Sequence, residues 1–346
     1  MPVGLSTYAF FWRSSDTAPR PLGLPGMLAE TRALGATVFQ ICDYPAIESM
    51  SSAQLRDLRD TAAGLDIALE LGTRGIWLAQ LERYLELAAI LDARFVRTML
   101  HTADHRPAPA EAIDLLRQAV PRYRDQGVTL GLETYEQVPT QDLLAVVHGV
   151  DSPNLGVCLD PANCVARLEL PAYVIGQVAP HVVNMHVKDF TFTRHEGWVG
   201  FSLIGCPLGT GLLDYDGMIR SVSPEERGIS QIVEHWLPRA TTMEETCRIE
   251  QQWTQQSCVF LGGRNQPPRP PGPRRFPPLV SRGRKARRAF TATRPRNSLT
   301  LAAEPLWAQR IITIQFRDAG CVLTLAEDPA DPTEGLKRSI DLGRTP

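Results

Sequence analysis

Short runs of apolar and β-branched residues alternate along the first three quarters of the chain with longer stretches of helical periodicity. In the stretch 79–91, for example, Leu81 and Leu85 recur at helical spacing, with Glu82 and Glu86 on the opposite face. Alternation of this kind predicts βα units around a parallel sheet. The segments with strand character are 3–8, 37–42, 67–72, 95–100, 128–133, 155–160, 182–187 and 230–234. The expected helices include 52–63, 79–91, 110–125, 140–148 and 241–260.

Eight strand–helix units within about 260 residues match an α/β fold of the (β/α)8 type, the TIM barrel. A doubly wound sheet is the competing architecture, but no G-x-G-x-x-G turn follows the first strand. We therefore expect residues 1–261 to form one barrel domain.

The composition changes after Leu261. Residues 262–296 are dense in proline and arginine and contain no acidic residue. Such a segment cannot build a core, so we expect 262–346 to be a low-complexity, disordered basic extension. The run 310–316 could form a strand, although it has no obvious neighbour to pair with. A shifted reading frame in GC-rich coding sequence would produce a similar composition.

The overall charge of −2 hides a difference between the two parts. Residues 1–261 contain 20 Lys+Arg against 31 Asp+Glu, and residues 262–346 contain 16 against 7. An acidic body disfavours nucleic-acid binding by the barrel, because it repels the phosphate backbone. The basic run 282–288 leaves a nucleic-acid-associated arm as the least favoured alternative.

No apolar run approaches the roughly 20 residues that span a bilayer, and the first residues do not resemble a secretory signal. The seven cysteines form no C-x-x-C pair. These features predict a cytoplasmic protein without a membrane partner.

Four side chains capable of chemistry follow or end consecutive apolar strands. They are Glu133, Asp160, His186 and Glu234. Because the carboxyl ends of barrel strands meet at one face, we expect these groups to converge there. Three carboxylates would repel one another unless a cation joined them, and one imidazole with three carboxylates suits Mn²⁺, Mg²⁺, Co²⁺ or Zn²⁺. Taken singly, a strand-end carboxylate is more often a helix cap, and a lone histidine is more often a core residue.

The sequence resembles the xylose isomerase-like TIM barrels, which include sugar isomerases and epimerases. The resemblance covers nearly all of 1–261. It implies that Glu133, Asp160, His186 and Glu234 bind the metal and that the two glutamates also move protons. The matching motifs are Gly131-Leu-Glu133, Cys158-Leu-Asp-Pro-Ala-Asn163, Asn184-Met-His-Val-Lys-Asp189, Pro207-Leu-Gly-Thr-Gly211 and Ile232-Val-Glu-His-Trp236.

Within this superfamily, the segments 6–12, 39–45, 69–75 and 197–201 look like those of the 3-oxo-isoapionate decarboxylases. That likeness implies decarboxylation of a branched 3-oxo sugar acid to L-erythrulose in apiose catabolism, through an enediolate. The alternative is a sugar isomerase or epimerase, of the ketose 3-epimerase or hydroxypyruvate isomerase type. The endonuclease branch, which uses additional histidines, is disfavoured because Asn163 stands at one of those positions.

Decarboxylation needs a cation that places the substrate carboxylate. Arg74, just beyond the third strand, is the best candidate, and its alternative is a loop salt bridge. Lys188, beside His186, is the second candidate and is predicted to be catalytic. It could instead pair with Asp189 or with a ligand carboxylate.

Three further side chains are predicted to contact the small keto-sugar or sugar-acid substrate. Asn163 and Gln40 could bind hydroxyl groups, and His101 could donate a proton or support the ligands. Homo-oligomerisation is left open by the sequence.

Overall fold

The computed structural model describes residues 2–195, 197 and 199–264, together with the backbone of 299–301, 311–317 and 320–326. The chain divides into two units, Met1–Gly272 and Pro273–Pro346, and each is treated separately.

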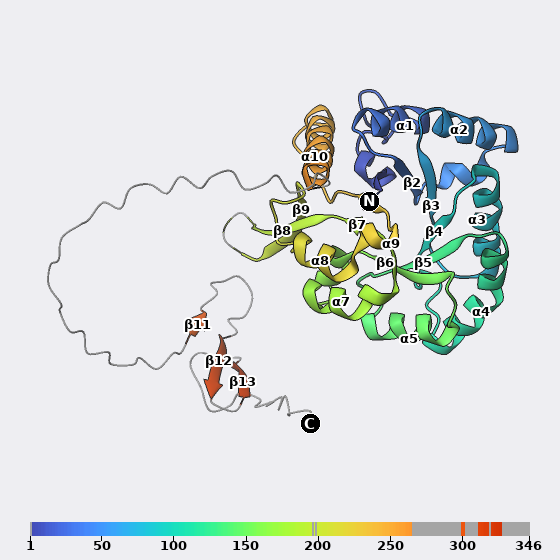
Figure 1. Cartoon of the computed structure of the whole chain (residues 1–346). Coiled ribbons are helices and arrows are strands. Elements are labelled where there is room, and N and C mark those ends of the chain that lie inside the picture. The colour runs from blue at the N-terminus through green and yellow to red at the C-terminus, as the bar shows by residue number, and fades with distance from the viewer. Residues whose placement is uncertain are drawn as a thin grey trace, which may run out of the picture. The chain divides into compact units, whose positions relative to one another are not determined.

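Eight parallel strands close into a barrel in the first unit, in the order β1-β10-β7-β6-β5-β4-β3-β2 (Figure 1). Each predicted strand is present, so the TIM-barrel prediction is confirmed. Several strands are buried at every position because helices surround the barrel, which is why they appear in the sequence as largely apolar runs. The strands are β1 Val3–Ser6, β2 Val38–Cys42, β3 Ala68–Gly72, β4 Phe95–Thr98, β5 Thr129–Glu133, β6 Leu155–Leu159, β7 Val182–Val187 and β10 Gln231–Val233.

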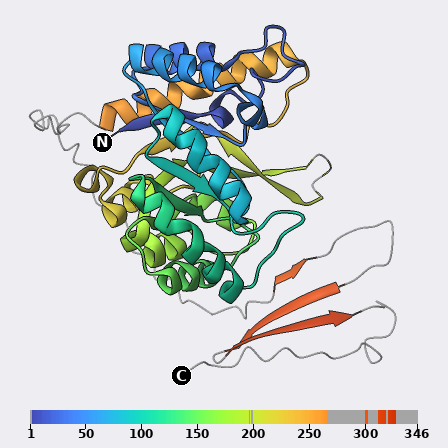
Figure 2. The same cartoon turned by 90° about the vertical axis from the view of Figure 1, so that its right-hand side faces the viewer.

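Helices pack around the outside of this barrel (Figure 2). The five expected helices are present as α2, α3, α4, α5 and α10. Helix α2 begins at a capping box, in which Ser51 and Gln54 each satisfy a backbone N–H of the other. The helices are α1 Leu24–Ala33, α2 Ser52–Gly64, α3 Leu78–Leu91, α4 Pro109–Asp125, α5 Thr140–Val150, α6 Pro161–Val165, α7 Pro171–Val178, α8 Tyr215–Val222, α9 Pro224–Arg227 and α10 Met243–Arg264.

A β-hairpin follows β7 directly. Its strands, β8 Asp189–Arg194 and β9 Phe201–Cys206, pair antiparallel outside the barrel sheet. The sequence analysis assigned no strand to this insertion between β7 and β10, because isolated hairpin strands bury too little to show a clear alternation. The insertion is anchored by Asp189, which accepts hydrogen bonds from the backbone N–H groups of Gly209 (2.9 Å), Gly211 (2.9 Å) and Leu213 (3.0 Å).

The second unit contains a three-stranded antiparallel sheet, formed by β11 Leu299–Leu301, β12 Ile311–Arg317 and β13 Gly320–Ala326. The run at 310–316 was expected to lack a partner, and this expectation was wrong. Strand β13 supplies the main partner because its apolar run begins only a few residues after β12 ends. Residues 262–264 of the predicted disordered extension belong to the end of α10, and its remaining residues apart from these three strands, including 282–288, lie outside the described residues.

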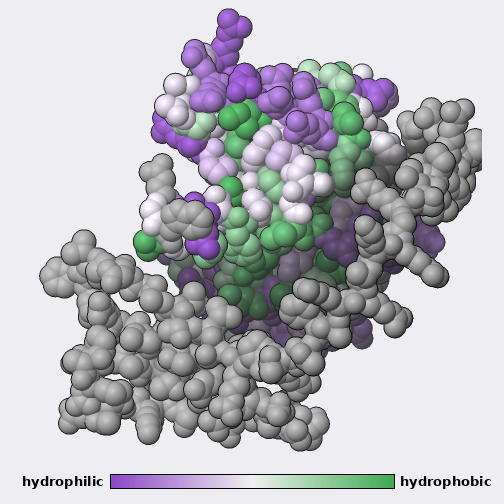
Figure 3. All heavy atoms as spheres, turned by 90° about the vertical axis from the view of Figure 1, so that its left-hand side faces the viewer, coloured by the Kyte–Doolittle hydropathy of each residue, from purple (hydrophilic) through white to green (hydrophobic). Residues whose placement is uncertain are grey.

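Apolar side chains gather on one face of the barrel unit, as Figure 3 shows. A groove of about 890 Å³ on this unit is lined by side chains of the hairpin and of neighbouring loops, among them Leu168, Leu170, Phe192, Phe201 and Leu212. Each of these five residues is more than half exposed. Such an exposed apolar surface is compatible with the homo-oligomerisation that the sequence left open. Among the described residues, no helix has the length and apolar character needed to cross a membrane.

Candidate active site

The four predicted ligand residues meet at the carboxyl ends of the barrel strands. Glu133 ends β5, Asp160 follows β6, His186 lies on β7, and Glu234 follows β10. All four are buried. Nδ1 of His186 lies 3.3 Å from Glu133 Oε1, 3.8 Å from Asp160 Oδ2 and 3.5 Å from Glu234 Oε2. The predicted convergence is therefore present in the structure.

The two oxygens of Asp160 have different surroundings. Oδ1 caps helix α6 by accepting hydrogen bonds from the backbone N–H groups of Ala162 (3.1 Å) and Asn163 (3.3 Å). Oδ2 points into the cluster, 3.8 Å from His186 Nδ1. Asp160 therefore caps a helix and also faces the cluster, because each contact uses a different oxygen.

The cluster fits a divalent cation. Glu133, Asp160 and His186 can each offer one ligand atom, and these atoms all lie within 4.8 Å of one another. Nδ1 of His186 is buried and makes no hydrogen bond, although it faces three carboxylate oxygens. A buried nitrogen without a hydrogen bond, surrounded by oxygen donors, matches the ligand preference of Mn²⁺, Mg²⁺, Co²⁺ or Zn²⁺.

Lys188 supplies a buried positive charge beside this cluster. Its Nζ lies 2.7 Å from Asp160 Oδ2 and 3.1 Å from Glu234 Oε2, and 4.7 Å from the centre of the Trp236 ring. Burial by itself would lower the pKa of Lys188, but the carboxylates of Asp160 and Glu234 raise it above its usual range. Of the pairings considered from the sequence, the structure shows the one with the cluster carboxylates and not the one with Asp189.

A second buried cation, Arg97, was missed by the sequence analysis. This β4 residue forms an ion pair with Glu133, contacts Asp43 Oδ1 at 3.1 Å and donates to the carbonyl of Thr73 at 2.9 Å. Burial would raise the pKa of Glu133, but Arg97 and His186 lower it below its usual range. The signal that could have revealed Arg97 is a charged residue inside the apolar run 95–100, since such a residue must point to a partner.

Arg74 stands at the mouth of the site. Its Nη2 lies 2.9 Å from Asp43 Oδ2 and donates to the Tyr8 hydroxyl at 2.8 Å, and its side chain is 54% exposed. Arg74, Arg97 and Lys188 line one pocket of about 440 Å³, together with Glu133 and Glu234. Arg74 thus makes the salt bridge that was considered as its alternative role and also faces the pocket.

The three remaining predicted residues differ in position. Asn163 lines the pocket and donates to Glu133 Oε1 at 2.8 Å. Gln40 is fully buried beneath the cluster, where its Oε1 lies 2.8 Å from Nε2 of His186. His101 lies beyond β4, with Nε2 3.3 Å from the carbonyl oxygen of Pro107, and it is not among the pocket-lining residues. The structure therefore brings Asn163, but neither Gln40 nor His101, to the pocket surface.

Comparison with known proteins places the chain in a family. The model of the xylose isomerase-like TIM barrel family matches residues 28–257. A 3-oxo-isoapionate decarboxylase from Pectobacterium atrosepticum is 57% identical over 265 residues, which are 77% of this chain and 96% of the relative.

Solved structures show the same fold. A D-psicose 3-epimerase crystallised in the presence of D-fructose has a TM-score of 0.57 at 16% identity, covering 76% of this chain and 98% of the epimerase. A xylose isomerase-like protein from Mycobacterium smegmatis in complex with magnesium also has a TM-score of 0.57, at 19% identity, covering 75% and 97%. The chain belongs to the xylose isomerase-like TIM barrel family.

Proposed function

We propose that this protein is a divalent-metal-dependent carbon–carbon lyase that decarboxylates 3-oxo-isoapionate to L-erythrulose in the cytoplasm. The substrate assignment rests on the 57% identity to the Pectobacterium atrosepticum decarboxylase. The two buried cations in the pocket provide the structural support.

The fully buried charges of the cluster favour an acidic substrate over a neutral sugar; the ion pair Asp43–Arg74 and the partly exposed Glu136 are counted apart from them. Glu133, Asp160 and Glu234 bring three negative charges, and Arg97 and Lys188 bring two positive charges. A divalent cation would change this excess of one negative charge into an excess of one positive charge. A single substrate carboxylate then neutralises the buried site, which is costly to leave charged.

Arg74 is the group we assign to the substrate carboxylate. Only its Nη2 is engaged by Asp43 and Tyr8, and no hydrogen bond from Nε or Nη1 occurs within the described part of the chain. A guanidinium can hold a carboxylate through two parallel hydrogen bonds. Asn163, which also lines the pocket, is assigned to a substrate hydroxyl.

Glu133, Asp160, His186 and Glu234 would hold the cation, which supplies Lewis-acid polarisation of the substrate carbonyl and its neighbouring hydroxyl. The carbon–carbon bond to the carboxylate breaks, CO2 leaves, and the electron pair remains on the carbon beside the carbonyl. That carbon must then receive a proton. Burial would lower the pKa of Lys188, yet its carboxylate neighbours raise it, so Lys188 holds a proton within the pocket and is assigned as the donor.

The alternative is an isomerase or epimerase, in which Glu133 and Glu234 would exchange a proton with the substrate. One observation favours it. Burial would raise the pKa of both glutamates, but neighbouring cationic side chains lower the pKa of each, so both are ionised and able to act as bases.

The test begins with metal-stripped protein that is supplied separately with Mn²⁺, Mg²⁺, Co²⁺ or Zn²⁺. We expect release of CO2 and formation of L-erythrulose from 3-oxo-isoapionate. Ketoses without a carboxylate should not react. Interconversion of ketoses without CO2 release would instead establish the isomerase or epimerase.

Arg74→Ala should lower kcat/KM for the acid by roughly 10- to 100-fold, as expected for one lost charge-assisted hydrogen-bonding group. Arg32→Ala is the matched control, because Arg32 is an exposed arginine in a 3.5 Å salt bridge with Asp66, away from the pocket lining. Equal kcat/KM values for the two variants would remove Arg74 from the site.

A further inference from the structure

A buried polar group crosses the barrel interior beneath the carboxylate cluster. It consists of Gln40 on β2, Glu70 on β3 and Asn184 on β7, all of them buried. Gln40 and Glu70 are directly paired across neighbouring strands. Strands β2 and β7 are separated in the barrel by β1 and β10, so contacts with Asn184 reach across the interior. Buried polar groups are costly unless their hydrogen bonds are made, so this arrangement requires an explanation.

Glu70 fixes the orientation of both amides. Its Oε2 accepts hydrogen bonds from Gln40 Nε2 at 3.1 Å and from Asn184 Nδ2 at 2.9 Å. A carboxylate oxygen only accepts, so each amide must turn its NH2 group toward Glu70. A proton on the other oxygen, Oε1, would leave Oε2 an acceptor and would not change this result. The carbonyl oxygen of Gln40 therefore points away from Glu70.

That carbonyl oxygen lies 2.8 Å from Nε2 of His186. Because Gln40 Oε1 can only accept, Nε2 of His186 must carry a hydrogen. In the neutral imidazole, the form that binds a metal, the lone pair is then on Nδ1, which faces the three carboxylates. A reversed Gln40 amide would place the hydrogen on Nδ1 instead, and this nitrogen could not then bind a cation. Nothing in a glutamine by itself selects between these orientations.

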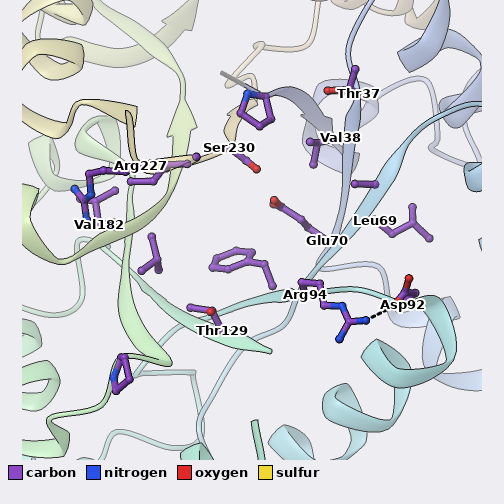
Figure 4. A pocket seen from close by; sticks show the side chains of 17 residues that line it. Thr37, Val38, Leu69, Glu70, Asp92, Arg94, Thr129, Val182, Arg227 and Ser230 are labelled. Atoms are coloured by element: carbon purple, nitrogen blue, oxygen red, sulfur yellow. Dashed lines mark hydrogen bonds and ion pairs between the residues drawn. The ribbon is translucent and has the colours of Figure 1, made fainter. Parts of the chain in front are cut away.

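Glu70 also borders a second pocket, of about 550 Å³ (Figure 4). Its lining places it at the amino ends of the strands, opposite the active site. The pocket is lined by residues at or just before the starts of strands, including Thr37 and Val182, and Glu70 points into it toward Ser230. Water in this pocket can hydrate one side of the Glu70 carboxyl group. Hydration lowers the cost of keeping a carboxylate inside the barrel.

We propose that Glu70 is a positioning residue that acts through Gln40 to hold His186 with its hydrogen on Nε2 and its metal-binding lone pair on Nδ1. This inference rests on the proposed function, since it concerns the metal that the cluster would hold. Outer hydrogen-bond partners of a ligating histidine commonly change metal affinity by 10- to 100-fold.

The test measures Mn²⁺ affinity of metal-stripped full-length protein, from free Mn²⁺ detected by electron paramagnetic resonance. Glu70→Gln should raise the Kd by about 10- to 100-fold, because glutamine can present either an acceptor or a donor to Gln40. The double variant Glu70→Gln/Gln40→Glu should restore the Kd to within about threefold. In that variant the carboxylate stands beside His186 and still accepts from Nε2. Gln231→Met, which alters another fully buried barrel glutamine, is the control for a general structural effect.

A second measurement, by nuclear magnetic resonance, detects directly which nitrogen of the His186 ring carries the hydrogen. In Zn²⁺-loaded protein labelled with ¹⁵N-histidine, the His186 signals are identified by their loss in His186→Gln. Wild type and the double variant should show a hydrogen on Nε2 and metal on Nδ1, and Glu70→Gln should show a mixture. A Glu70→Gln variant with wild-type Kd and a single Nε2–H form would overturn the inference alone. A wild-type protein that binds none of these cations would overturn the metal-dependent function and this inference with it.

Discussion

Removal of the Asp189 carboxylate should be among the most destabilising single changes in the barrel unit. Asp189 is buried and accepts four backbone hydrogen bonds, two on each oxygen. The N–H groups of Phe190 and Leu213 are at buried positions, and those of Gly209 and Gly211 are partly accessible to water. Each buried N–H left without a partner costs about 1–3 kcal/mol, and the accessible ones cost less. We therefore expect Asp189→Ala to lower the free energy of unfolding by about 3–5 kcal/mol.

Urea unfolding followed by tryptophan fluorescence measures this loss. The matched control is Asp214→Ala, because Asp214 caps α8 through a single exposed hydrogen bond to the N–H of Gly217 at 2.9 Å. Loss of such a cap should cost about 1 kcal/mol. If the two variants differ by less than about 1 kcal/mol, Asp189 does not anchor the insertion as argued. The shape of the active-site pocket should also change, since Leu203 of the hairpin β8–β9 lines that pocket.

Three further predictions concern pH, metal removal and packing. Burial raises the pKa of Glu250 to about 7, so between roughly pH 4.5 and 7 the folded chain keeps a proton that the unfolded chain releases, and the unfolding free energy falls as pH rises. The unfolding free energy of wild type minus that of Glu250→Gln should thus fall by about 2.5 kcal/mol from about pH 5 to about pH 8, and a constant difference in urea unfolding would contradict the raised pKa. Chelation with EDTA should abolish activity, and activity should recover when Mn²⁺ is added. It should also lower the unfolding free energy by about 3 kcal/mol relative to protein in the presence of metal at 100 times its Kd. Calorimetry measures this loss, and an unchanged unfolding transition would argue against a bound metal. Gly156→Ala should lower the free energy of unfolding by about 1–3 kcal/mol, because the new Cβ would lie 2.7 Å from the His181 carbonyl oxygen. Gly64→Ala is the control and should be neutral or stabilising, because its Cβ would have nothing within 4 Å. Equal melting temperatures for the two variants would refute the close contact at Gly156.

The sequence by itself determined the barrel. Strands covered on both faces are mostly apolar, so the eight appear as short, largely apolar runs that local sequence patterns reveal. It also determined which side chains meet, because parallel strands in a closed barrel place their carboxyl ends at one rim. Glu133, Asp160, His186 and Glu234 could be expected to converge for this reason alone.

The tertiary structure decided which partners the site residues meet. Arg97 becomes a partner of Glu133 only when β4 and β5 lie side by side, and the strand pattern alone does not show which side chains face inward. Gln40 was expected at the pocket but lies beneath His186, because its depth along the strand depends on barrel register. The hairpin β8–β9 and the pairing of β12 were also missed, since partners distant from a local window determine whether a short run forms a strand. Local periodicity indicates whether a residue is buried, but the packing of strands against one another determines which side chain that residue contacts.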